Sequence, residues 1–406
     1  MGTSLQTENS FRSQIKPLGN DQPRLHLRFL DGLRGLAALY VLLFHAQMMT
    51  VQMENYRWVS PVVVCGTRWL EYGHYAVAMF IVLSGYCLML PVARSGGNLV
   101  GGFRQYLIRR ARRMLPPYYA ALVLSLIINF VYKVVSIHFG ASSHKQEGSI
   151  LTDALTHLFL VHNLSRNYSH SINSAMWSVA TEWDIYFLFP ILLLPIWRKF
   201  GSVAVISIGL LAGLLPIAIL PSSDNFAWAC PWYISLFAMG MVGAAVMSRN
   251  SASTQDQRLP FYWLSGAFAI CCVLLAPRRA IDHDGGSALT DILAGLAAIC
   301  VIAGSAQIVQ NNFIPRSVVL RILESRPAVQ LGVFSYSIYL IHLPILVCLY
   351  WGLRSLKIPY DAVCVVVWLA GVPLILAGAY LFHLLFERRF MSSAGLPQEV
   401  RSANSR

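Results

Sequence analysis

Long apolar blocks, separated by shorter polar segments, fill most of the chain. A helix needs about 20 predominantly apolar residues to cross roughly 30 Å of hydrocarbon, and ten blocks come close to that length. The fourth to seventh blocks are the least clearly separated from one another. The pattern predicts an all-α, polytopic transmembrane helical bundle of about ten membrane-spanning helices, at residues 29–49, 74–93, 116–136, 177–197, 202–221, 230–248, 260–277, 288–308, 332–353 and 361–385.

The composition supports the same class. Of the 406 residues, 56% are hydrophobic and only 12% are charged, and the mean hydropathy is +0.56. A soluble domain carries about 25% charged residues, so this supply cannot coat a globular surface of this size. Soluble, disordered, collagenous and disulfide-rich secreted proteins are therefore excluded. The eight cysteines lie mostly within apolar blocks and form no Cys-x-x-Cys pair, so we predict neither a metal site nor a disulfide framework.

Positive charge predicts the orientation. The formal net charge is +13, but in a membrane protein an excess of Lys and Arg marks cytoplasmic loops and does not indicate nucleic-acid binding. With the N-terminus inside, 21 of the 31 Lys and Arg residues fall on inner segments and 9 on outer segments. We expect a protein of the cell (inner or plasma) membrane, surrounded by the lipid bilayer. Both of its tails, 1–28 and 386–406, are expected to be cytoplasmic, and 29–385 to form the transmembrane domain.

One outer segment contains a further apolar stretch. The segment 137–176 is rich in His, Ser and Asn, and within it Thr152–Leu164 is apolar but too short to cross the membrane. We expect this stretch to be re-entrant or interfacial.

The first block carries ionisable residues, which are costly in hydrocarbon and are therefore candidates for function. Arg34 and His45 are eleven positions apart, so on a helix they point to the same side, about 16 Å apart along the axis. Asp31 precedes Arg34 by three residues and can pair with it. Two interpretations of Arg34 stay open: a functional group, or a side chain that snorkels to the headgroups with Asp31 as partner. For His45, in the outer half of the helix, function is the favoured interpretation.

The fourth block begins at Trp177 and is expected to run from outside to inside, which would put Glu182 near the depth of His45. A carboxylate beside an imidazole fixes its tautomer and stabilises the imidazolium, as a general base requires. We therefore predict His45 and Glu182 as a catalytic pair in which Glu182 orients His45. Tyr186 lies one turn below Glu182 on the same face, whereas Asp184 faces elsewhere. The alternative is an acidic residue placed at the outer helix end by the helix dipole.

Two further features leave alternatives open. His342 lies near the middle of the ninth block, where a catalytic histidine and a core histidine bonded to a neighbouring helix are equally plausible. The cluster Arg109, Arg110, Arg112 and Arg113 precedes the third block without an acidic residue. It fits a positive-inside stop, and it also suits an anionic cofactor that carries phosphates. No Walker A, Gly-x-Ser-x-Gly, His-Glu-x-x-His or Gly-x-Gly-x-x-Gly motif is present to indicate ATP, a serine hydrolase, zinc or a nicotinamide.

Several motifs, in order along the chain, resemble those of the acyltransferase-3 family of integral membrane acyltransferases, which act on surface polysaccharides, oligosaccharides and macrolides. They are Leu30-Asp-Gly-Leu-Arg-Gly-Leu-Ala-Ala with Phe44-His45, Phe80-Ile-Val-Leu-Ser-Gly-Tyr86, Arg109-Arg-Ala-Arg-Arg-Met-Leu-Pro-Pro-Tyr-Tyr119, Trp177-Ser-Val-Ala-Thr-Glu-Trp-Asp-Ile-Tyr-Phe-Leu-Phe-Pro190 and Tyr336-Ser-Ile-Tyr-Leu-Ile-His342. One position departs from the pattern: many members carry an acidic residue where this chain has Ala78.

The resemblance implies transfer of an acyl group, usually acetyl, from cytoplasmic acetyl-CoA or another acyl-CoA to a hydroxyl, without a metal. The acceptor would be a carbohydrate, a glycolipid or a small molecule. His45 corresponds to the essential histidine of the family. Arg34 corresponds to the first-helix arginine of the family, and the later cluster of Arg109, Arg110, Arg112 and Arg113 corresponds to its cytoplasmic arginine motif; we assign all five to cofactor binding. The chain is expected to resemble the stand-alone members, in which the membrane domain completes the reaction.

Within this interpretation we assign Trp177, Tyr186 and His342 to substrate binding. His45 would deprotonate the acceptor hydroxyl, and Arg34 would contact the donor side, because 16 Å is too far for both to touch one carbonyl. An acyl-enzyme on Ser84, Ser178 or His45 is an open alternative. The main rival function is a proton-coupled transporter or flippase that uses the same buried groups as a proton relay, and a lipid-binding scaffold is a second rival.

Overall fold

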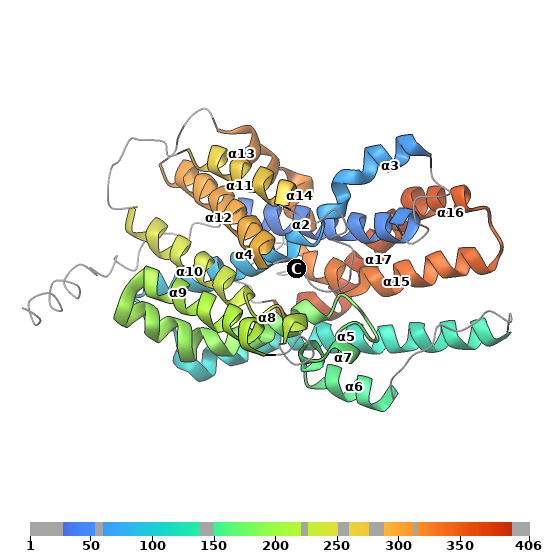
Figure 1. The fold of residues 1–406 in the computed structure, drawn as a ribbon, viewed down its shortest axis with the longest axis horizontal. Helices are drawn as coiled ribbons and strands as arrows, with labels where there is room; N and C mark the ends of the chain where they lie inside the picture. The colour runs from blue at the N-terminus through green and yellow to red at the C-terminus, as the bar shows by residue number, and fades with distance from the viewer. Residues whose placement is uncertain are drawn as a thin grey trace, which may run out of the picture.

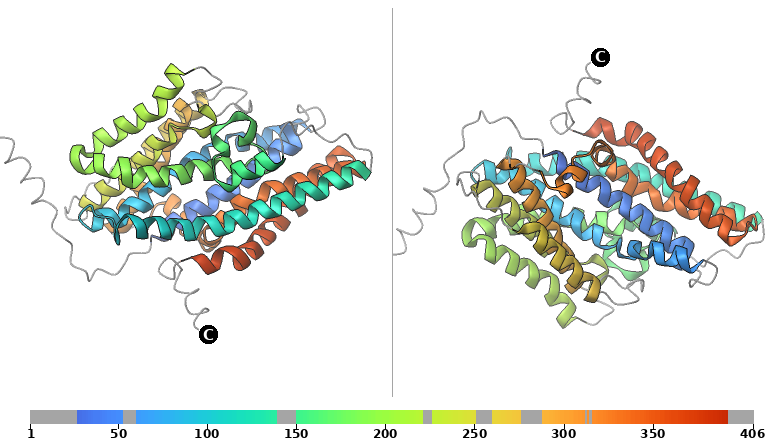
Figure 2. Two further views of the ribbon diagram at one scale, coloured as in Figure 1. Left: turned by 90° about the horizontal axis from the view of Figure 1, so that it is seen from below. Right: turned by 90° about the horizontal axis from the view of Figure 1, so that it is seen from above.

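The computed structural model describes residues 27–52, 60–138, 150–220, 226–250, 260–275, 288–311, 313 and 316–391. Most of both predicted tails lies outside these residues. Over the ranges described the chain is almost entirely helical and contains no strand, which confirms the prediction of an all-α helical bundle. The long helices lie side by side in one bundle (Figures 1 and 2).

The described helices fall into a longer and a shorter group. The longer ones are α2 (Arg28–Gln47), α4 (Tyr75–Arg94), α5 (Gly102–His138), α8 (Trp177–Leu188), α9 (Leu194–Ile219), α10 (Tyr233–Asn250), α11 (Phe261–Leu275), α12 (Ala288–Gln310), α15 (Ser335–Ser355) and α17 (Val372–Phe382). The shorter ones are α3 (Pro61–Thr67), α6 (Ile150–Leu158), α7 (Arg166–Ser169), α13 (Val318–Leu323), α14 (Arg326–Val333) and α16 (Tyr360–Val366). Short π-helical turns join α8 to the first part of α9 and α16 to α17.

Eight of the described helical stretches are long and apolar enough to cross a membrane, against about ten predicted. One of the eight, Trp177–Ile219, has 43 residues and would be about 65 Å long, twice the thickness of the hydrocarbon. It is broken at Gly201, whose φ of 81° leaves the helical region, and its two arms diverge in Figure 2. The arms correspond to the predicted spans 177–197 and 202–221. The predicted span 260–277 is the 15-residue helix α11, which falls short of a full crossing length.

Helix α4 lies at the centre of the bundle and packs closely on α10. A Cβ atom at Gly85 would lie 2.1 Å from the carbonyl oxygen of Phe237, and one at Gly240 would lie 2.1 Å from that of Val82. The two glycines therefore let the backbones touch, as small residues do where helices associate in lipid. This contact fixes the register of the polar residues that α4 presents to its other neighbours.

Helix α2 packs on α14 through a similar contact. A Cβ atom at Gly35 would lie 2.3 Å from the carbonyl oxygen of Ala328, and one at Gly332 would lie 2.0 Å from that of Asp31. Helix α15 contacts both α2 and α5, and the Tyr336 hydroxyl donates to the Met114 carbonyl at 3.1 Å. Helices α2, α4, α5, α8 and α15 consequently face one interior region.

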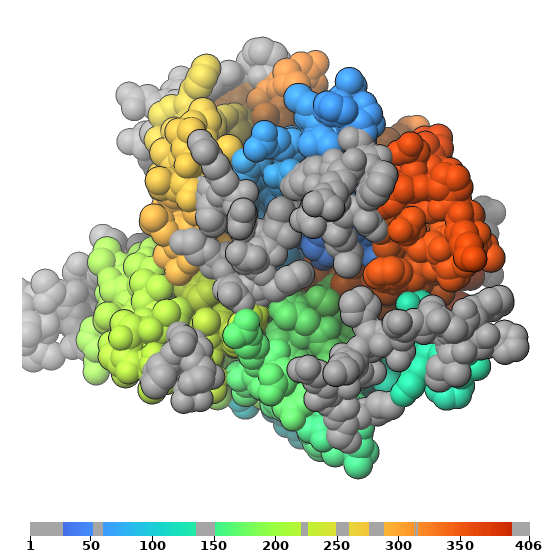
Figure 3. Space-filling view, turned by 45° about the vertical axis from the view of Figure 1, so that its right-hand side comes forward, coloured from blue at the N-terminus to red at the C-terminus, as the bar shows by residue number. Residues whose placement is uncertain are grey.

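The segment 150–176 lies at the surface of the bundle (green, lower part of Figure 3). It contains α6 and α7 and is not among the stretches long enough to cross the membrane. Leu151 and Phe159 are both 68% exposed, whereas the rings of His157 and His162 are buried and stacked 3.8 Å apart. Burial lowers the pKa of both histidines, that of His162 to about 3. The apolar outer face and buried polar inner face fit the expected interfacial position, which stays a prediction.

Candidate active site

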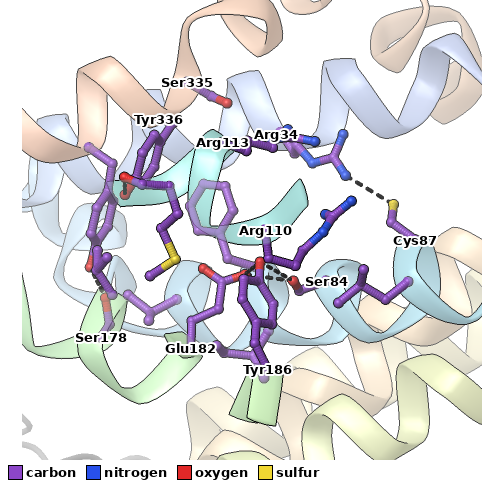
Figure 4. Close-up of a pocket in the computed structure, with 17 residues that line it drawn as sticks. Arg34, Ser84, Cys87, Arg110, Arg113, Ser178, Glu182, Tyr186, Ser335 and Tyr336 are labelled. Carbon is purple, nitrogen blue, oxygen red and sulfur yellow. Dashed lines mark hydrogen bonds between the residues drawn. The ribbon is translucent and has the colours of Figure 1, made fainter. Parts of the chain in front are cut away.

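A cavity of about 970 Å³, partly open to solvent, lies where α2, α4, α5, α8 and α15 meet. The guanidinium groups of Arg34, Arg110 and Arg113 line it, and Glu182 is the only acid among its lining residues. Figure 4 shows Arg34 and Arg113 on one side of the cavity, Glu182 on the other, and Arg110 between them. The cavity is therefore a cationic site with one carboxylate in its wall.

The predicted arginine cluster divides between two faces of α5. Arg110 and Arg113 are three residues apart, and so one helical turn brings both to the cavity. Arg109 donates to the Val100 carbonyl at 2.6 Å, and neither Arg109 nor Arg112 lines the cavity. Because of the helix period, only Arg110 and Arg113 of these four arginines lie where they could contact a ligand in the cavity.

Arg34 reaches the same cavity from α2. Its guanidinium forms an ion pair with Asp31 at 3.1 Å, as the three-residue spacing predicted, and a contact of 2.9 Å with the sulfur of Cys87. Its side chain runs beside that of Arg113 in Figure 4. Because Asp31 neutralises only one of the three cationic groups, the cavity keeps a net positive charge.

Glu182 is held by two hydroxyl groups. The Ser84 hydroxyl donates to Glu182 Oε1 at 2.6 Å, and the Tyr186 hydroxyl donates to the same oxygen at 2.6 Å. The Ser84 and Tyr186 oxygens are 3.1 Å apart. Tyr186 therefore lies on the face predicted for it, whereas Asp184 is outside the cavity and accepts from Asn163. A serine hydroxyl aimed at a carboxylate inside a cavity is a candidate nucleophile and base.

The prediction that Glu182 orients His45 is wrong. The described hydrogen bonds of Glu182 go to Ser84 and Tyr186, and His45 is bonded elsewhere. On α4, Ser84 is only three residues, about 4.5 Å, from Cys87, which contacts Arg34. Glu182 therefore lies near the depth of Arg34 and not near that of His45. The error arose because α8 starts deeper in the bundle than the apolar pattern suggested.

His45 forms a pair with His342 instead. The distance between His45 Nδ1 and His342 Nε2 is 3.1 Å, and His342 Nδ1 lies 2.8 Å from the Tyr339 carbonyl oxygen. His342 Nδ1 must therefore donate, which leaves its Nε2 as an acceptor for His45 Nδ1–H. Since His45 Nδ1 also lies 2.9 Å from the Val41 carbonyl oxygen, the network assigns His45 Nε2 as its unprotonated nitrogen. When both histidines are neutral, the unprotonated nitrogen of His342 accepts from His45. The unprotonated nitrogen of His45 is then the basic nitrogen that the pair still offers.

Tyr339 and Ser178 separate this histidine pair from the cavity. Their hydroxyl oxygens are 2.6 Å apart, and both residues line the cavity. The ring of Tyr339 is 5.9 Å from that of His342. His45 and His342 are not among the residues that line the cavity, so the histidine pair lies behind this wall.

Another buried polar group lies outside the cavity. His74 Nε2 is 3.2 Å from Asp291 Oδ1, and the Trp232 indole donates to Asp291 Oδ2 at 2.8 Å. The ring of Trp177, assigned to substrate binding from the sequence, stacks on His74 and does not line the cavity. Sequence reasoning missed His74 and Asp291, although Asp291 lies within a predicted span and the rule for ionisable residues in hydrocarbon applies to it.

Comparison with known proteins identifies a family. The family model described as "Acyltransferase domain" matches residues 27–384. The chain is 24% identical over 347 residues to the "Putative peptidoglycan O-acetyltransferase YrhL" of Bacillus subtilis, covering 78% of the chain and 48% of that protein. It is 25% identical over 349 residues to the "Peptidoglycan O-acetyltransferase OatA" of Listeria monocytogenes, covering 80% of the chain and 50% of that protein. The "O-acetyltransferase OatA" of Staphylococcus aureus is 22% identical over 349 residues, with 79% and 51% covered.

The chain therefore spans about half the length of the curated relatives that it matches. No solved structure matches it. The family match covers every helix that contributes to the cavity and both histidines of the pair behind it.

Proposed function

The chain belongs to the acyltransferase-3 family of integral membrane acyltransferases, and from that premise we propose that it is an O-acyltransferase that uses an acyl-CoA donor. It would move an acyl group, with acetyl the first choice, to a hydroxyl of a carbohydrate or glycolipid acceptor. The observation that carries this proposal is the cavity that joins three arginines to a serine–glutamate pair inside a membrane bundle.

The donor is the better supported half of the proposal. Coenzyme A carries several phosphate charges, and guanidinium groups bind phosphate with forked, charge-assisted hydrogen bonds. Arg34, Arg110 and Arg113 converge from two helices on one cavity, which a positive-inside stop signal does not require. The same cavity contains Ser84 and Glu182, so a pantetheine arm whose phosphates lie at the arginines could bring its thioester to this pair.

The acceptor is assigned to the other side of the wall of Ser178 and Tyr339. His45 Nε2 is the unprotonated nitrogen of the pair, and a general base accepts a proton through such a nitrogen from an acceptor hydroxyl. The relatives named above are O-acetyltransferases, two of them of peptidoglycan, so a peptidoglycan-type glycan is the first acceptor to test. Cytoplasmic tails, an inner donor side and an outer acceptor side remain part of this proposal.

The test uses purified full-length protein and acetyl-CoA labelled in the acetyl group. Release of free thiol and transfer of label to soluble peptidoglycan strands are followed for wild type, His45→Ala and Glu182→Gln. The proposal predicts thiol release matched by label in the glycan, with at least a 100-fold loss in both variants. Folded protein that neither binds acetyl-CoA nor releases thiol would contradict it, and would favour the transporter or flippase alternative, which needs no acyl donor.

A further inference from the structure

Two reactive groups lie at two depths in this bundle. Ser84 and Glu182 line the cavity near the level of Arg34, whereas His45 and His342 lie behind Tyr339. Along α2, Arg34 and His45 are about 16 Å apart. A thioester inside the cavity therefore contacts the serine–glutamate pair and has no direct contact with His45.

From this separation we propose that Ser84 is a nucleophile that carries the acyl group as an oxygen ester between donor and acceptor, with Glu182 as its base and Tyr186 as a positioning residue. The inference rests on the proposed acyl-CoA donor, and it adds a covalent intermediate to that function. It divides the reaction into two half-reactions at Ser84 Oγ: coenzyme A leaves in the first, and the acceptor hydroxyl enters the cavity and takes the acyl group in the second.

Ser84 is distinguished from the other nucleophiles in the cavity by its partner. Ser178 is bonded to the Tyr339 hydroxyl, and Ser335 donates to the backbone carbonyl of Gly332. Cys87 is in contact with Arg34 and has no base beside it. Among the serines and the cysteine that line the cavity, only Ser84 donates to a carboxylate, at 2.6 Å. A base oriented by a third group is the arrangement that activates a hydroxyl nucleophile, and Tyr186 supplies that third group.

The chemistry balances without a further reactant. In the first half-reaction Ser84 Oγ attacks the thioester carbonyl, the new C–O bond forms, and the C–S bond breaks. The Ser84 proton passes to Glu182 and then to the departing sulfur, so coenzyme A leaves as the thiol. In the second half-reaction the acceptor oxygen attacks the ester, the bond to Oγ breaks, and the acceptor's proton ends on Oγ. Arg34 and Arg110 line the same cavity and supply positive charge for the oxyanion in each step.

The two half-reactions separate the roles of Ser84 and His45. Ser84 is needed to form the acyl-enzyme, whereas His45, which does not line the cavity, binds the acceptor before its hydroxyl reaches the ester. Loss of His45 should therefore let the acyl-enzyme accumulate, and loss of Ser84 should prevent it. Neither outcome follows from direct transfer between donor and acceptor.

The experiment incubates the purified full-length protein with labelled acetyl-CoA without acceptor and quenches it in acid. We expect a burst of thiol equal to the label on the protein, and an acetyl group on Ser84 by peptide mass spectrometry. The label should survive neutral hydroxylamine and be lost in alkaline hydroxylamine, as an oxygen ester is. Ser84→Ala should lower the labelling at least 100-fold while it still binds coenzyme A, and Ser84→Cys should give a thioester that neutral hydroxylamine removes.

Ser337 provides the matched control. Its hydroxyl donates to Glu387 at 2.6 Å, the same geometry as in the Ser84 pair, but Ser337 does not line the cavity. Ser337→Ala should label like wild type, and His45→Ala should label fully but fail to transfer. Three results would overturn the inference and leave the acyltransferase proposal intact. They are equal labelling of Ser84→Ala and wild type, a wild-type label that neutral hydroxylamine removes, and acyl transfer to the acceptor with thiol release but without any labelled protein. No thiol release under any condition would overturn both.

Discussion

The division of the arginine cluster predicts that two neighbouring pairs of arginines, equal in charge, differ in their effect on donor binding. Arg110 and Arg113 line the cavity, whereas Arg109 and Arg112 do not. Replacing either pair by glutamine removes two positive charges from the same two turns of α5. The two double variants therefore separate a bound ligand from the general field of a basic segment.

The expected magnitude follows from the contacts that each pair can make. A hydrogen bond to a charged group contributes about 1.5–3 kcal/mol, which corresponds to about 10- to 140-fold in the dissociation constant. Because the two cavity arginines share one ligand, their effects will not simply add, and we expect at least a 100-fold loss for the pair. The outer pair acts only through a field that is screened within about 8 Å at physiological salt, so a loss of no more than about threefold is expected.

The assay is equilibrium binding of coenzyme A to purified protein by calorimetry at two salt concentrations. Thermal unfolding of both variants controls for folding. The reasoning requires a large loss for Arg110→Gln/Arg113→Gln and a small, salt-sensitive loss for Arg109→Gln/Arg112→Gln. Equal losses in the two variants would show that the basic segment attracts the donor without the cavity, and would refute the placement of the donor between α2 and α5.

Further predictions concern the scaffold around the site. Gly85→Val should lower the thermal midpoint in detergent by several degrees, measured by tryptophan fluorescence, because the backbone of α10 leaves no room for a side chain there, whereas Gly266→Ala, which meets open space, should be neutral. Because the folded state lowers the pKa of buried His157 and His162, the fold is most stable at pH values where both side chains are neutral. This contribution to stability is complete above about pH 6.5 and is lost as the pH falls below it; for His162 the loss is about 1.4 kcal/mol per pH unit down to about pH 3. Circular dichroism melts across that range check the prediction, and a pH-independent midpoint would contradict it. Asp291→Ala should lower the free energy of unfolding by about 3 kcal/mol or more in chemical unfolding, because it removes the buried carboxylate that pairs with His74 and accepts from the Trp232 indole. A change below about 1 kcal/mol would contradict that reasoning.

Periodicity predicted much of the fold because it depends on local sequence. The apolar blocks and the pairing of Asp31 with Arg34 follow from helix length and helix spacing, and the structure contains both. The same spacing, applied to the cluster on α5, would have separated Arg110 and Arg113 from their neighbours. The break at Gly201 was also visible as the gap between two apolar blocks.

The relative depth in the membrane of residues on different helices could not be predicted in the same way. Whether Glu182 faces His45 or Ser84 depends on where α8 begins relative to α4, and that register is set by tertiary packing, including the glycine contact of α4 with α10. The pairing of His45 with His342, which are 297 residues apart, is equally invisible to local periodicity. Sequence reasoning therefore named several residues that the structure places in or beside the cavity, and it paired Glu182 and His45 with the wrong partners.

The central claim is that an acyl group from coenzyme A reaches a hydroxyl through this cavity. The most direct test places the purified protein in sealed vesicles, with labelled acetyl-CoA on one side and soluble peptidoglycan strands on the other. Our account predicts acetylated glycan on the far side, one thiol released for each acetyl transferred, and neither product with Arg110→Gln/Arg113→Gln. Glycan that stays unlabelled with wild-type protein that is folded and binds coenzyme A would contradict it.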